Sequence, residues 1–98
     1  MESRIALIGI VVEDLAASER LNRLLHEYSD YLVGRMGIPY RRRGIGIISV
    51  VIDAPNNVTS SLAGKLGMID GISVKTLYSR SFHEEESATA DKNFQQKR

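Results

Sequence analysis

The sequence contains no cysteine and only two histidines, His26 and His83. Without cysteine, the chain can form no disulfide bond, no thiolate metal site and no thiol nucleophile. His26 falls on the polar side of a predicted helix and His83 in a polar C-terminal stretch, so a two-histidine metal site would require that stretch to fold back. Neither histidine lies beside inward-facing carboxylates, as acid–base or nucleophilic catalysis would need. We therefore expect no enzymatic activity, no metal site and no cofactor.

The chain also lacks a strong net charge and a long apolar run. Its 13 basic and 12 acidic residues leave a formal net charge of +1, so no broad positive field favours nucleic acid. The longest apolar run, "IALIGIVV" (Ile5 to Val12), is too short to span a bilayer. The start before it carries one arginine and no small-residue cleavage pattern, so we expect no signal peptide. These features predict a cytoplasmic protein that contacts neither membranes nor, directly, nucleic acid.

The first half of the chain predicts a strand, a helix and two further strands. The β-branched run from Arg4 to Val12 is typical of a strand. Asp14 suits the N-cap of a helix, and apolar residues follow it at helical spacing, at Leu21, Leu24, Leu25 and Tyr28. A weaker strand is predicted over Tyr31 to Ile38. The polar turn "PYRRRG" then separates it from a strong strand over Ile45 to Asp53.

The second half completes the pattern. Pro55 lacks the N–H that a strand interior needs, so a second helix is predicted after it, capped by Asn56 or Asn57. Ile72 to Tyr78 alternates as a last strand. The β-α-β-β-α-β order within residues 1–79 predicts an α+β, ferredoxin-like sandwich, with a four-stranded antiparallel sheet and two helices on one face. Residues 80–98 show no sustained periodicity and are predicted to be a flexible polar tail.

The two strongest strands are apolar at both sets of alternating positions. Two helices can cover only one face of a sheet, so the other face would expose an apolar patch of the kind that marks interaction sites. We therefore predict a homo-oligomer, a dimer or a tetramer, without fixing which face associates. The predicted interface residues are Ile5, Leu7, Ile8, Ile10, Ile47, Ile48 and Val50. Two alternatives are central strands that are merely rich in Val and Ile, and a tail that folds back as a cover.

The glycines of "SLAGKLGMIDGISVKTL" (Ser61 to Leu77) raise the question of a phosphate-binding or RNA-binding loop. The P-loop pattern fails, because Leu66 stands where a hydroxyl belongs. "GKLG" matches the bare G-x-x-G of KH domains, but a strand pattern follows where a KH fold needs a helix. We therefore interpret Gly67 as a helix-ending residue with positive φ, Gly71 as a turn residue and Gly64 as a thin helix face for close packing.

The arginines of "RRR" (Arg41 to Arg43) form a basic turn between two predicted strands. Such a charge run is most often a solvated turn. It could also contact an acidic partner or a phosphate group.

Three segments resemble a family of small bacterial proteins described as regulators of iron-only hydrogenase systems. They are "IALIGIVVED", "GRMGIPYRRRGIGIISVVIDAP" and "LAGKLGMIDGISVKTLYS", which together span most of residues 1–79. Ala63 departs from the serine usual in the last segment. The resemblance implies an ACT-like domain, similar in shape to the C-terminal domain of the nickel-responsive repressor, whose subunits associate through their sheets. That relative's His and Cys metal ligands and its DNA-binding segment have no counterpart here, so neither nickel sensing nor operator binding transfers.

Together these features predict a non-enzymatic, homo-oligomeric regulatory domain that acts through a small effector or a regulatory protein partner. ACT-like domains often bind effectors at the first β–α loop, at a subunit boundary. The resemblance thus implies a ligand site formed by Glu13, Asp14 and Leu15 of one subunit with Gly37 and Ile38 of another. Asp14 acting only as a helix cap is the plainer alternative. A purely structural assembly subunit and a KH-like RNA-binding module are the other functions considered.

Overall fold

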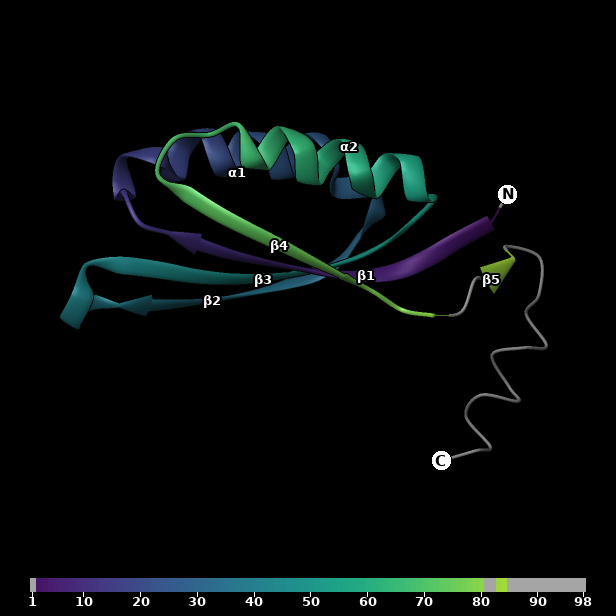
Figure 1. The fold of residues 1–98 in the computed structure, drawn as a ribbon, viewed down its shortest axis with the longest axis horizontal. Coiled ribbons are helices and arrows are strands. Elements are labelled where there is room, and N and C mark those ends of the chain that lie inside the picture. Colours follow the sequence, from purple (N-terminus) through teal and green to yellow (C-terminus); the bar gives the residue numbers. More distant parts are fainter. Residues whose placement is uncertain (1, 81–82, 85–98) are drawn as a thin grey trace, which may run out of the picture.

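The computed structural model describes residues 2–80 and 83–84 (Figure 1). The strands are β1 (Glu2–Val12), β2 (Leu32–Tyr40), β3 (Ile45–Ala54), β4 (Ile72–Tyr78) and β5 (His83–Glu84), and the α-helices are α1 (Ser18–Glu27) and α2 (Asn56–Gly67). Three short 3-10 turns join them: η1 (Leu15–Ala17), η2 (Ser29–Tyr31) and η3 (Arg41–Arg43). Each predicted element is present, with ends that differ by no more than a few residues from the predicted ones.

The sheet has the strand order β2-β3-β1-β4, and every neighbouring pair is antiparallel. Both helices lie on one face of this sheet, and no described element covers the other face (Figure 1). This arrangement confirms the α+β, ferredoxin-like and ACT-like fold. The two central strands, β1 and β3, are those whose sequences are apolar at both sets of alternating positions. One apolar set on each of these strands therefore lies on the face that the helices do not cover.

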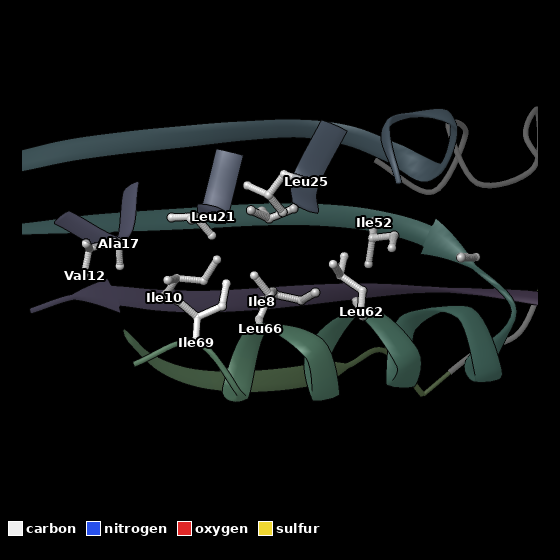
Figure 2. Packing of buried hydrophobic residues seen from close by; sticks show 13 residues of the cluster. Ile8, Ile10, Val12, Ala17, Leu21, Leu25, Ile52, Leu62, Leu66 and Ile69 are labelled. Atoms are coloured by element: carbon white, nitrogen blue, oxygen red, sulfur yellow. The ribbon is translucent and has the colours of Figure 1, made fainter. Parts of the chain in front are cut away.

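The hydrophobic core fills the space between the helices and the sheet. Alternate β1 residues Ile8 and Ile10 point toward α1 and α2 and meet Leu25 and Leu66 (Figure 2). Alternation along a strand puts every second side chain on the same face, which is why one register of β1 and β3 is buried and the other is not. The buried apolar residues are Ala6, Ile8, Ile10, Val12, Ala17, Leu21, Leu25, Val50, Ile52, Ala54, Leu62, Leu66 and Ile69.

Both ends of α2 differ from the prediction. The helix begins at Asn56, and the preceding Pro55 occupies the N-cap position without any side-chain hydrogen bond, so neither asparagine caps it. The main-chain carbonyl of Pro55 accepts from the N–H of Thr59 at 3.2 Å instead. Gly67 is the last helical residue and lacks a positive φ, because α2 ends through Met68 in ordinary right-handed conformation. A Cβ on Gly64 would meet no atom within 4 Å, so Gly64 faces open space rather than a close neighbour.

The chain beyond residue 79 contributes one more strand. The prediction of a separate tail over 80–98 is wrong at His83–Glu84, because these residues form β5 and pair antiparallel with Ser3 and Glu2 at the start of β1. A strand start with a free edge offers backbone groups that a following segment can pair with. Residues 81–82 and 85–98 of the predicted tail lie outside the described residues.

Candidate functional site

The uncovered side of the sheet carries a continuous apolar surface, which we call the open face. We define its apolar residues from the strand registers and the alternating burial: Ile5, Leu7, Val11, Met36, Ile38, Tyr40, Ile45, Ile47, Val51 and Leu77. Met36, Leu77 and Ile38 have 70%, 68% and 59% of their surface exposed. Scattered exposed apolar residues are normal, but a contiguous set on four strands is typical of an interaction surface.

The open face is organised in rows that cross the strands. One row joins Ile38, Ile47 and Val11, and another joins Val51 to Leu7 and Leu77. Between these two apolar rows lies a row with the small residues Gly9 and Ser49 at its centre, and with Met36 and the exposed Lys75 at its two ends. The surface therefore has two apolar ridges with a shallower middle, a shape into which a second flat surface can pack closely.

The structure divides the predicted interface residues between the two faces. Ile5, Leu7 and Ile47 lie on the open face, as an interface requires. Ile8, Ile10 and Val50 are 0–1% exposed beneath the helices, and Ile48 packs against the same core, so their inclusion in a subunit interface is wrong. The alternation of side chains along each strand separates the two sets, and the sequence pattern did not show which set the helices would cover.

Sequence reasoning also missed part of the open face. Met36 and Tyr40 on β2 and Leu77 on β4 belong to it, although they were not among the predicted interface residues. The detectable pattern was the alternation of "ISVKTLY", which places Leu77 on the side opposite to Val74 and Tyr78. In β2 two glycines and a one-residue bulge between Leu32 and Gly34 hid the same alternation.

A shallow groove of about 460 Å³ lies at the β1–β4 side of the open face. Its lining is mostly apolar and ends in two polar residues: Ile5, Ala6, Leu7, Leu77, Tyr78, Ser79 and Arg80. The main-chain N–H of Ser79 donates to the carbonyl of Ile5 at 2.9 Å, which continues the β1–β4 pairing past Tyr78. The guanidinium of Arg4 lies over the ring of Tyr78, 5.4 Å from its centre. The groove is therefore built on firmly paired backbone.

The first β–α loop, predicted as an effector site, is tied closely to the turn before β4. The main-chain N–H groups of Glu13 and Asp14 both donate to the carbonyl of Gly71, at 2.7 and 3.1 Å. The Asp14 carboxylate accepts from the N–H of Ala16 at 3.0 Å, so Asp14 caps η1. The hydroxyl of Ser73 donates to the Glu13 carboxylate at 3.1 Å. Both acidic side chains thus have a local structural role.

The predicted site residues do not come together within one chain. Leu15 is 58% exposed in η1. On β2, Gly37 lies opposite Ile48 on the helix side, and Ile38 lies opposite Ile47 on the open face. β3 lies between β2 and β1, and Glu13 directly follows β1, so Ile38 and Glu13 are two strand spacings, or about 10 Å, apart across the sheet.

A polar cluster joins the two helices on the covered side. The hydroxyls of Tyr28 and Ser61 lie 3.0 Å apart, and the Lys65 ammonium lies 5.3 Å from the centre of the Tyr28 ring. The Ser61 hydroxyl and the nearby ammonium stabilise the phenolate, which lowers the pKa of Tyr28 below 10.0. The same contact with Tyr28 raises the pKa of Lys65. The cluster is open to solvent, and we interpret it as a contact between α1 and α2.

The structural context of "GKLG" is helical. Gly64 to Gly67 form the last turn of α2, and the chain then turns into β4. A KH domain needs this motif in a loop between two helices. The structure therefore removes the basis of the KH-like alternative.

The arginines of η3 form the exposed tip of the β2–β3 hairpin, at the end of the molecule far from β5 (Figure 1). Gly44 closes this turn with φ +68°. Arg35, further back along β2, donates to the Asn22 amide oxygen at 3.0 Å and so ties this strand to α1. The tip itself is a compact positive charge, and no side-chain hydrogen bond or ion pair joins its arginines to another described residue.

Residues 2–80 and 83–84 contain no group of three or more metal-ligating His, Asp or Glu side chains. Within the same residues, neither helix has the length and apolar character needed to cross a bilayer.

Comparison with known proteins gives a match over most of the chain. A family model described as "Iron-only hydrogenase system regulator, putative" (TM1266-like) matches residues 4–76. The solved structure of the uncharacterized protein TM1266 from Thermotoga maritima is 35% identical, with a TM-score of 0.76 over 80% of this chain and 99% of that one. A formyltetrahydrofolate deformylase from Pseudomonas putida KT2440 is 18% identical, with a TM-score of 0.51 over 76% of this chain and 28% of that one, which is a likeness of fold alone. No curated protein matches the chain.

Proposed function

This chain belongs to the TM1266-like family of iron-only hydrogenase system regulators, and we propose that it is a non-enzymatic regulatory domain that works as a homo-oligomer. Its regulatory effect would pass through a small effector or a protein partner, without direct contact to nucleic acid. The observation that carries the proposal is the open face, on which Leu7, Ile47 and Met36 are exposed on neighbouring strands.

The size of the open face suits a specific association. Four strands at about 4.8 Å spacing and eight residue steps along β3 give a patch of roughly 19 by 27 Å. Two such patches together bury on the order of 1,000 Å², which is near the lower limit for a specific protein–protein interface. Because the patch is built on paired strands, its shape changes little on association, and less ordering entropy opposes binding.

The proposal is tested by placing a charge at the centre of the open face. Leu7→Lys keeps the helix-side core intact and puts an unpaired ammonium where the second sheet would pack. We expect light scattering at micromolar concentration to show a dimer or a larger oligomer for the wild type and a folded monomer for Leu7→Lys. Far-UV circular dichroism checks that the variant is folded.

Met68→Lys is the matched control. Met68 is apolar and 82% exposed, but it lies after α2 in the helix layer, away from the open face. This variant should keep the wild-type oligomer. A wild type that is monomeric at micromolar concentration, or a Leu7→Lys variant that associates as well as the wild type, would contradict the proposal.

A regulatory domain differs from a purely structural assembly subunit in having a ligand-dependent state. A ligand that binds only the folded protein raises its melting temperature. A thermal-shift screen of amino acids, nucleotides and metal ions therefore distinguishes the two functions. The site to probe first is the first β–α loop at Glu13, with Glu13→Gln as the variant expected to remove a shift caused by a cationic effector.

A further inference from the structure

The hairpin that β2 and η3 form carries a concentrated positive charge. Residues 32–44 contain four arginines, Arg35 and Arg41–Arg43, and no acidic residue, in a chain whose formal net charge is only +1. Arg35 donates to Asn22, and no ion pair neutralises any of the four arginines within the part of the chain that the structure describes. Because a guanidinium has five N–H donors, Arg35 keeps most of its capacity to bind a carboxylate.

β2 is also an edge strand with an unpaired outer side. It lies at one end of the strand order β2-β3-β1-β4, and no described main-chain group bonds to its outer edge. In an antiparallel pair, the N–H and C=O groups of successive residues point in alternation toward the partner strand and away from it. Pro39 has no N–H to donate to β3 and yet stays in register with Gly46, so it belongs to the outward-pointing set. The free edge therefore offers the N–H and C=O groups of Arg35 and Gly37.

The two faces of this edge differ in chemistry. On the covered side, Arg35 lies beside Asn22 of α1. On the open face, β2 presents Met36, Ile38 and Tyr40, of which Met36 and Ile38 are 70% and 59% exposed. A strand added to the edge would place alternate side chains on the two faces. Acidic side chains on one face would then meet Arg35, and apolar side chains on the other would extend the open face.

The charge of β2 disfavours a second copy of this chain as the added strand. Two β2 edges side by side would bring two basic hairpins together without an acidic residue between them, and like charges across paired strands are destabilising. The bulge between Leu32 and Gly34, together with Pro39, also interrupts the edge at both ends. The regular stretch between them suits a strand of about five residues. A short acidic segment from another protein meets both conditions.

We propose that the β2 edge binds a short extended segment of a protein partner in which acidic and apolar residues alternate. The segment pairs through its main chain with Arg35 and Gly37. Its acidic side chains contact Arg35 and Arg41–Arg43, and its apolar side chains lie beside Met36 and Ile38. Main-chain pairing supplies affinity, and the alternating side chains supply selectivity. This inference rests on the proposed function and deepens it, because that function includes a protein partner whose chemistry and contact surface it does not state.

The probe is a fluorescein-labelled, end-blocked peptide of about seven residues in which glutamate alternates with valine. We expect fluorescence anisotropy to show saturable binding at about 50 mM salt, and binding at least about tenfold weaker at about 500 mM, because salt screens exposed charge contacts. A peptide with lysine in place of glutamate should not bind. Changing Arg41, Arg42 and Arg43 together to Ser should weaken binding of the glutamate peptide at least about tenfold.

Gly37→Pro and Gly37→Ala are a matched pair that tests the main-chain contacts. Both variants leave every charge in place, and a Cβ on Gly37 would meet only the Ile48 side chain, at 4.0 Å. Gly37→Pro removes an outward N–H and places a ring on the free edge, so it should weaken binding at least about tenfold. Gly37→Ala keeps the N–H and should bind as the wild type does. Circular dichroism checks that both variants are folded.

Absence of saturable binding by the glutamate peptide would overturn the inference. Equal binding by Gly37→Pro and the wild type would overturn it too, and an oligonucleotide that then binds as well as the peptide would identify the hairpin as a non-specific polyanion site. Sedimentation equilibrium without peptide measures the oligomeric state separately. A monomeric wild type that binds the peptide would contradict the proposed homo-oligomer while supporting this inference.

Discussion

Gly71 is the position at which a single added methyl group should be most damaging outside the core. Its φ is +87°, and a Cβ built on it would lie 2.6 Å from the Cβ of Asp14. Its carbonyl also accepts both main-chain N–H groups of the first β–α loop, those of Glu13 and Asp14. Gly71→Ala therefore strains the backbone and pushes the loop away from the carbonyl that holds it.

The magnitude follows from three contributions. A non-glycine residue held at positive φ costs about 1–2 kcal/mol. Weakening two main-chain hydrogen bonds adds about 0.5–1.5 kcal/mol for each. The clash with Asp14 forces the loop to move or the turn to distort, so we expect Gly71→Ala to lower the free energy of unfolding by about 3 kcal/mol. For a domain of this size, that corresponds to a loss of more than about 10 °C in melting temperature.

Gly44→Ala is the control that isolates the close approach. Gly44 has φ +68°, but a Cβ there would meet no atom within 4 Å, so only the backbone strain of about 1–2 kcal/mol applies. Urea denaturation of both variants at one protein concentration, so that association contributes equally, measures the difference. The argument is refuted if Gly71→Ala is no more destabilising than Gly44→Ala. Adding Asp14→Gly, which removes the Cβ that clashes, should reduce the effect of Gly71→Ala.

Two further predictions concern α2. Thr59 is fully buried, and its hydroxyl has no hydrogen-bond partner among the described residues. Thr59→Val should therefore raise the free energy of unfolding, measured by urea denaturation, by about 1 kcal/mol, whereas Thr59→Ser, which keeps the hydroxyl, should not. A Thr59→Val variant that is less stable than the wild type would show that the hydroxyl is satisfied. The hydrogen bond with Ser61 lowers the pKa of Tyr28 most, and Lys65 lowers it further. Phenolate absorbance should therefore appear at lower pH in the wild type than in Ser61→Ala, with Tyr28→Phe as the blank. Equal titrations of the wild type and Ser61→Ala would contradict the contact. Because the pKa of Tyr28 is lowered in the folded state, its ionisation stabilises the fold as pH rises through the folded-state pKa of Tyr28. The raised pKa of Lys65 stabilises the fold below pH 10.5, and this contribution is lost as pH rises through the folded-state pKa of Lys65.

The order of the elements and the existence of an uncovered apolar surface could be predicted from the sequence. Periodicity of 2 in Ile72 to Tyr78 and of 3.6 around Leu21 and Leu25 depends only on local geometry, so it identifies strands and helices without knowledge of their neighbours. The β-α-β-β-α-β order then restricts the topology to few arrangements. A chain with two helices and doubly apolar central strands has more apolar strand surface than it can cover alone.

Which apolar residues lie on the uncovered side was decided only by the tertiary structure. In β1 and β3 both alternating sets are aliphatic, so no local property distinguishes Ile8 from Leu7 until the helices dock on one face. The same holds for glycines: the sequence predicted a positive φ at Gly67, but of Gly67 and Gly71 only Gly71 has one, and its carbonyl accepts from the first β–α loop. Local pattern specifies elements, whereas the choice of face and the placement of charges such as Arg35 depend on which surfaces pack together across distant parts of the chain.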